Sequence, residues 1–139
     1  MLNPEVVRRR LAKLEEFIEI LESLRRYDRK TFKSDPEHYG SAERFLQLAI
    51  ESVNDVASHV AAARDLGPIE ASRDLPVAFV REGVVDQDLA QRWTRMIGFR
   101  NILVHNYLEI DRDIVFDVLQ DNLRDFQELA RAFSVYLGE

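Results

Sequence analysis

Residues 46–60 read LQLAIESVNDVASHV, with an apolar side chain at every third or fourth position. The apolar positions are Leu46, Ala49, Ile50, Val53, Val56, Ala57 and Val60. Because an α-helix turns by about 100° per residue, these side chains fall on one wide face. The stretch therefore predicts a core helix, which we expect to stop at Gly67-Pro68. The other edge of the same helix carries Glu51, Asp55 and Ser58, spaced four and three residues apart.

The N-terminal segment also predicts a helix. Asn3 is a good N-cap, and Pro4 suits the first helical position. Apolar side chains then recur at helical spacing at Val7, Leu11, Leu14, Ile18 and Leu21. We expect this helix to run from about Pro4 to Tyr27. A polar connector, Asp28 to Gly40, should follow, with one turn at residues 31–33.

Two helices are predicted between the core helix and the C-terminal region. A short one should span Leu75 to Glu82, with Asp74 as its cap and Gly83 as its stop. The next should begin at the cap Asp86 and continue to about His105.

A last helix is predicted to begin near Asp111. Its inward-facing side chains are expected to be Val115, Val118, Leu119, Phe126, Leu129 and Phe133. No segment shows the period of two that is typical of a half-buried strand. The sequence therefore predicts an all-α fold, an up-down bundle of about five helices, in a single domain over residues 1–139.

The composition is that of a soluble globular protein. Hydrophobic residues make up 46% and charged residues 32% of the 139 positions. There is no cysteine, no apolar run of about 18 residues, and no basic and apolar leader at the N-terminus. We therefore expect a cytoplasmic protein without disulfides, thiolate metal ligands or membrane spans.

The net charge of −6 is unfavourable for binding nucleic acid, but it is unevenly distributed. Nine basic and six acidic residues up to Ser34 give +3, so the remainder of the chain carries −9. The basic side chains are Arg8, Arg9, Arg10, Lys13, Arg25, Arg26, Arg29, Lys30 and Lys33. They form either a patch that contacts RNA or the solvated face of an amphipathic helix, and the second interpretation is favoured.

Residues 99–108, FRNILVHNYL, place polar and charged side chains in an apolar segment. On an ideal helix Arg100 and Tyr107 are roughly 20° apart, and Asn101 and His105 share a neighbouring face. Arg100 and His105 are about 140° apart, so one straight helix would not direct both at one phosphate. Either the helix breaks near His105 or a second subunit completes the site.

These residue types suit metal-independent cleavage of RNA. Histidine titrates near neutral pH, so His105 can move a proton between the 2′-hydroxyl and the leaving oxygen. Arginine stays charged, so Arg100 can stabilise the negative charge that develops at phosphorus. Glu51 and Asp55 are candidates to orient Arg100 through a charge-assisted hydrogen bond. The structural alternative is that Arg100 pairs with a buried acid and His105 caps its helix.

The other notable side chains have structural interpretations. We expect His59 to be a hydrogen-bonded helix histidine and His38, in the connector, to be solvated. Trp93 and Phe99 are expected in the core rather than stacked on bases. The three histidines are scattered and form no His-x-x-x-His pair, so the sequence predicts neither a metal site nor a cofactor.

The string Arg-x4-His-x-Tyr at Arg100, His105 and Tyr107, with polar Asn101 after the arginine, resembles the signature of the HepT-like toxins of the HEPN superfamily. The similarity extends over most of the chain. It includes the long first helix, the Asp35-Pro36 turn, the segment ERFLQLAIE at residues 43–51, and Asp111 before the last helix.

This resemblance implies a homodimer of α-helical subunits whose motif helices meet at a cleft. It implies a metal-independent endoribonuclease, the toxin of a type VII toxin–antitoxin system, with Arg100 and His105 catalytic. Beside this resemblance, we expect Asn101, Glu51 and Asp55 to be supporting residues. A minimal nucleotidyltransferase antitoxin (MntA-like) would be the partner and would transfer AMP to Tyr107, which adds bulk and negative charge at the cleft.

Two other functions remain open from the sequence. One is a non-catalytic helical module of the same superfamily that binds a nucleotide or serves as the partner subunit of a nucleotidyltransferase. The other is a purely structural dimerisation bundle. The intact Arg100, His105 and Tyr107 favour the ribonuclease, whereas the acidic net charge slightly favours the non-catalytic module.

Overall fold

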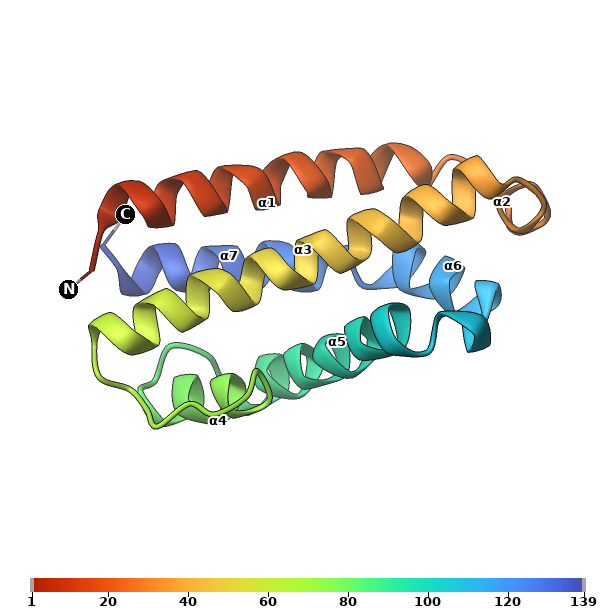
Figure 1. Cartoon of the computed structure of the whole chain (residues 1–139). Helices are drawn as coiled ribbons and strands as arrows, with labels where there is room; N and C mark the ends of the chain where they lie inside the picture. The colour runs from red at the N-terminus through yellow and green to blue at the C-terminus, as the bar shows by residue number, and fades with distance from the viewer. Residues whose placement is uncertain (1, 139) are drawn as a thin grey trace.

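Within residues 2–138, four long helices form the body of the molecule and run alternately up and down (Figure 1). The computed structural model describes residues 2–138. The long helices are α1 (Pro4–Leu24), α3 (Pro36–Ala63), α5 (Gln87–His105) and α7 (Leu123–Tyr136). Three short helices connect them: α2 (Arg29–Ser34), α4 (Asp74–Arg81) and α6 (Arg112–Asp121). A 3-10 turn, η1 (Tyr107–Glu109), lies between α5 and α6. The expected all-α up-down bundle is confirmed.

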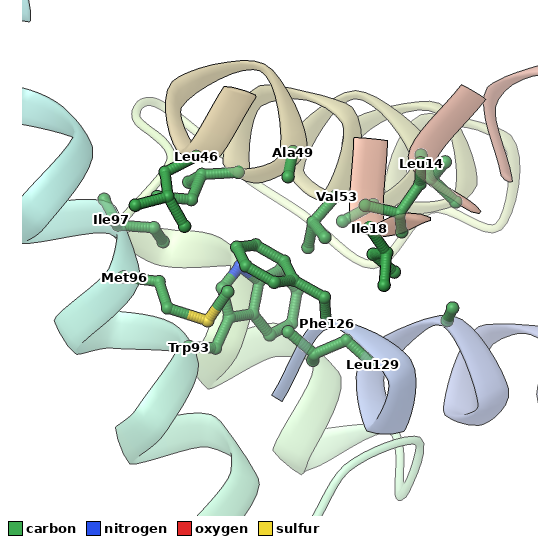
Figure 2. Packing of buried hydrophobic residues seen from close by; sticks show 14 of the residues in the cluster. Leu14, Ile18, Leu46, Ala49, Val53, Trp93, Met96, Ile97, Phe126 and Leu129 are labelled. Atoms are coloured by element: carbon green, nitrogen blue, oxygen red, sulfur yellow. The ribbon is translucent and has the colours of Figure 1, made fainter. Parts of the chain in front are cut away.

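The long helices enclose one hydrophobic core. Figure 2 shows Leu14 and Ile18 of α1, Val53 of α3, Trp93 of α5 and Phe126 of α7 converging on the same interior. Trp93 is fully buried, and its ring makes edge contacts with Phe79 and Phe133. Phe99 is half-buried and packs against the same core. The prediction that Trp93 and Phe99 serve packing is confirmed.

The segment expected to be a polar connector is helical instead. Asp28 accepts a hydrogen bond from the Thr31 amide at 2.8 Å and so caps α2, and fully buried Phe32 holds this helix against the core. Asp35 accepts from the Glu37 amide at 2.9 Å and caps α3, which therefore begins at Pro36 and not after Gly40. The caps Asp28 and Asp35 therefore explain why the expected connector forms the short helix α2 and the first turn of α3.

Several helix ends differ from the prediction by a few residues. The first helix ends at Leu24 rather than Tyr27. The core helix ends at Ala63, before Gly67, because Asp65 takes a left-handed φ of 55°. Asp74 is the first residue of α4 and not its cap. Its carboxylate accepts hydrogen bonds from the amides of Glu70 and Ala71, which precede the helix.

Other helix ends agree with the sequence. Asn3 and Asp86 cap α1 and α5 through bonds to the amides of Glu5 and Leu89. Gly83 follows α4 with a φ of 79°, which favours glycine, and its amide bonds to the Val80 carbonyl.

The predicted last helix is two helices, which meet at Asn122. The backbone of Asn122 (φ −116°, ψ 3°) departs from helical geometry, and its side-chain amide donates to Asp125. The break accompanies a buried ion pair, because Asp125 is only 1% exposed and accepts from Arg92 of α5 at 2.6 Å. The hydrogen bonds that Arg92 donates to the carboxylates of Glu128 and Asp125 raise its pKa, so it stays charged. No helix within residues 2–138 is long and apolar enough to span a membrane.

Candidate functional site

The site forms where the C-terminal half of α5 passes the middle of α3. Arg100 lies on the last turns of α5 and is partly exposed, with a side-chain accessibility of 29%. Its Nε and one terminal nitrogen each lie 3.0 Å from Oε2 of Glu51 on α3. The predicted charge-assisted contact between Glu51 and Arg100 is confirmed. Since Arg100 is ionised at any accessible pH, the pair fixes a cation at the molecular surface without burying it.

Glu51 is held by a second residue on its own helix. Gln47 lies one turn earlier and donates from Nε2 to the same Glu51 oxygen at 3.0 Å. Glu43 lies one further turn back, and partial burial raises the pKa of its carboxyl, although Arg112 acts in the opposite direction. Gln47 thus restrains the carboxylate of Glu51, which in turn restrains Arg100. Sequence reasoning missed Gln47, although its spacing of four from Glu51 was a usable signal.

A polar groove of about 250 Å³ lies beside Arg100. Its lining residues are Glu51, Asn54, Asp55, Ser72, Ile97, Arg100 and Asn101, from α3, α5 and the loop before α4. Asn101 accepts a long hydrogen bond, 3.4 Å, from Arg100. Asp55 is exposed on the groove wall, and no hydrogen bond or ion pair joins it to Arg100 in the described structure. The groove therefore brings together four of the predicted residues: Glu51, Asp55, Arg100 and Asn101.

Asn54 is a groove residue that sequence reasoning did not identify. It is 9% exposed, and its Oδ1 accepts from the indole Nε1 of Trp93 at 3.0 Å. An indole N–H can only donate, so this bond sets which way the amide points. The sequence does distinguish Asn54, because it lies four residues after Ile50 and three before Ala57 and so falls on the apolar face of the core helix. It is a polar residue within the apolar face.

His105 is the last residue of α5, and the helix ends there. Asn106 takes φ −123° and ψ 40°, and its amide bonds to the Ile102 carbonyl at 3.0 Å. Of the two sequence alternatives, the break near His105 is therefore observed. His105 is exposed. It does not line the groove beside Arg100.

Tyr107 lies beyond the break, in η1, with 66% of its surface exposed. The expectation that it shares a helical face with Arg100 is wrong, because that geometry required α5 to continue past His105. The next residue, Leu108, is 87% exposed. Tyr107 thus stands on a protruding turn and is accessible to another macromolecule.

The other two histidines have different surroundings. His59 accepts from the Asn3 amide at 3.2 Å, which confirms its interpretation as a hydrogen-bonded helix residue. The prediction of a solvated His38 is wrong. Its ring stacks on Tyr27 at 3.6 Å between centroids, and its side chain is only 16% accessible. The cause is the early start of α3, which brings His38 back against the end of α1. In residues 2–138 no three His, Asp or Glu side chains are grouped so as to hold a metal ion.

The basic N-terminal residues are in part paired with acids. Arg29 contacts Asp113 and Asp117 at 3.0 and 2.8 Å, and Lys33 contacts Asp113 at 2.8 Å. These hydrogen bonds lower the pKa of Asp113. Arg25 pairs with Glu22 on its own helix. These pairs support the interpretation of a solvated, ion-paired helix surface over a dedicated RNA patch.

Comparison with known proteins finds a matching family model and relatives that are nucleases. The model of the family described as ribonuclease HepT-like matches residues 10–133. The chain is 35% identical over 101 residues to the mRNA nuclease HepT of Shewanella oneidensis, covering 73% of this chain and 76% of the relative. It is 23% identical over 136 residues to the tRNA nuclease HepT of Aphanizomenon flos-aquae, covering 98% and 92%.

Solved structures agree in fold over nearly the whole chain. The tri-AMPylated Shewanella oneidensis HEPN toxin, in complex with MNT antitoxin, superposes with a TM-score of 0.87 at 28% identity, covering 96% of this chain and 99% of the other. A toxin–antitoxin complex with AMP-PNP gives a TM-score of 0.87 at 27% identity, covering 94% and 98%.

Proposed function

The chain belongs to the ribonuclease HepT-like family, and we propose that it is an RNA-cleaving toxin, neutralised by a nucleotidyltransferase antitoxin, whose catalytic residues are Arg100 and His105. The observation that carries the site assignment is the Arg100–Glu51 pair. It fixes a permanently charged, partly exposed guanidinium beside an open groove, five residues before an exposed histidine.

The reaction follows from the chemistry of these two side chains. The 2′-oxygen of the RNA attacks the adjacent phosphorus while its proton is removed, and the 5′-oxygen of the next nucleotide leaves with a proton. His105 moves the proton at one of these two oxygens. Arg100 stabilises the extra negative charge on the phosphorus-bound oxygens in the transition state. The products are a 2′,3′-cyclic phosphate and a 5′-hydroxyl, and this route uses no metal ion.

Glu51 and Gln47 are positioning residues in this proposal. They do not touch the phosphate but hold the guanidinium in place before the substrate arrives, which reduces the reorganisation needed during the reaction. Asn101 and Asp55 border the same groove and support substrate binding.

Two copies of the chain are proposed to form one cleft. Exposed apolar side chains occur within the motif and shortly after it, with Ile102 at 46%, Leu108 at 87% and Ile114 at 52%. A two-fold dimer that covers them would bring two Arg100–His105 pairs together. Because its substrate is RNA, we expect the enzyme to act in the cytoplasm.

The nucleotidyltransferase is proposed to transfer AMP to the hydroxyl of Tyr107. The relative solved with MNT antitoxin is AMPylated, and the 66% exposure of Tyr107 gives another enzyme access to it. The phosphate added there would repel the RNA backbone. The test is co-expression with the nucleotidyltransferase followed by intact-mass measurement. A mass increase of one or more AMP groups with loss of RNA cleavage supports the proposal. Full cleavage by fully modified protein contradicts it.

A further inference from the structure

We propose that the groove between α3, α5 and the Ser72 loop binds a nucleobase of the substrate RNA next to the cleaved phosphate. This proposal rests on the proposed function, since it names what the same site reads in its substrate. The groove adjoins Arg100, so a nucleotide whose phosphate contacts Arg100 has its base within reach of the groove walls.

The first argument is an unused donor on a buried side chain. Asn54 is nine-tenths buried and lines the groove, and Trp93 occupies its Oδ1. Its Nδ2 has no hydrogen-bond partner among residues 2–138. This nitrogen keeps contact with solvent in the open groove, so it is available to donate to a ligand that binds there.

The second argument is the mixture of acceptor and donor groups around Asn54. Asp55 supplies an exposed carboxylate that only accepts hydrogen bonds when ionised. Asn101 uses its Oδ1 to accept from Arg100, which leaves its Nδ2 as a donor. Ser72 supplies a hydroxyl that serves as either. The edges of nucleobases also carry donors and acceptors side by side, so they can pair with these groove groups.

The carboxylates also argue against a second phosphate in this groove. Glu51 and Asp55 both line it, and Arg100 already neutralises Glu51. A phosphate beside Asp55 would meet an unpaired negative charge, whereas a base is neutral. The volume of about 250 Å³ lies below the usual range for drug-sized ligands and suits a single base. The Arg100 guanidinium provides a flat surface on which a base can stack.

The test compares the bases found next to the cut in a random RNA pool cleaved by wild type and by Asp55→Asn. The substitution keeps the shape of the side chain but converts half of its acceptor capacity into donors. Since one base contact is worth about 1–3 kcal/mol, we expect the preferred base to change or its preference to fall by about tenfold. Asn54→Asp, which keeps an acceptor for Trp93 and removes the Nδ2 donor, should alter the preference in a different way.

Glu37→Gln is the matched control. It removes the same charge from an exposed position at the start of α3, far along the helix from the groove. It should leave the preference unchanged. A wild-type enzyme that cleaves RNA with no base preference at the cut, or an Asp55→Asn variant with the wild-type preference, overturns the base-binding groove and leaves the proposed function standing. A purified wild type that cuts no RNA overturns both.

Discussion

Arg100 of α5 and Glu51 of α3 are joined by two contacts of 3.0 Å to a single carboxylate oxygen. Both side chains are about one-third accessible, so the pair is neither buried in the core nor freely solvated. Pairs of this exposure contribute little to folding stability. In the proposed mechanism its effect on function is larger, because it selects one orientation of the Arg100 cation.

Glu51→Gln should therefore lower RNA cleavage more than it lowers stability. A charge-assisted hydrogen bond is worth about 1.5–3 kcal/mol, which corresponds to roughly ten- to a hundredfold in rate. We expect this loss in kcat with little change in KM, because the cation acts mainly on the transition state. Steady-state kinetics on a short RNA substrate measures both. Glu37→Gln serves again as the charge-matched control, and an equal loss there would refute a positioning role for Glu51.

Arg92 should be important for stability rather than catalysis. Removing it by Arg92→Ala leaves the carboxylate of Asp125 buried without its partner, and breaking such a pair costs about 3–5 kcal/mol. Urea unfolding followed by circular dichroism measures the change. Arg124→Ala, at an exposed position on α7, should change stability by no more than about 0.5 kcal/mol. Similar midpoints for the two variants would disprove this role.

Tyr107→Phe should prevent modification while leaving the fold intact, because it removes only the acceptor oxygen from a side chain that is largely exposed. If the hydroxyl serves only as the switch, toxicity persists when the nucleotidyltransferase is co-expressed. If it also binds phosphate, cleavage falls by an amount equivalent to about 1.5–3 kcal/mol. Intact mass reads the modification directly. AMP added to Tyr107→Phe as readily as to wild type would rule out Tyr107 as the acceptor.

The protein should be a homodimer in solution, because Ile102, Leu108 and Ile114 leave apolar surface exposed near the motif. Light scattering at micromolar concentration should give twice the monomer mass of 16.2 kDa. Leu108→Asp should shift the protein toward monomer, whereas Val77→Asp, at an exposed apolar position on α4 away from the motif, should not. A monomer mass for the wild type would contradict the shared cleft.

The fold was largely predictable because helical periodicity repeats over long stretches. The apolar face of residues 46–60 and the caps Asn3 and Asp86 specify their helices through local interactions. The break at Asn122 was not predictable from periodicity, because it accompanies the tertiary pair of Asp125 with Arg92. The helical connector was missed although its caps, Asp28 and Asp35, are local signals, because the core packing of Phe32 that holds α2 in place depends on distant residues.

The site was predictable to a smaller extent. The sequence offered Glu51 and Asp55 as partners for Arg100, and only the contact with Glu51 is observed. The groove was not predictable, because it depends on how α3, α5 and the Ser72 loop lie together. Ideal-helix geometry also gave a wrong position for Tyr107, since the local conformation of Asn106 ends α5 first.

The central claim is that Arg100 and His105 cleave RNA by internal attack of the 2′-hydroxyl. Its most direct test is to analyse the ends of RNA cut by purified, antitoxin-free protein in excess EDTA. The mechanism predicts 2′,3′-cyclic phosphate and 5′-hydroxyl ends, and a loss of about two to four decades in rate for His105→Ala. Cleavage that disappears in EDTA and returns with magnesium, or that His105→Ala retains at the wild-type rate, would contradict it.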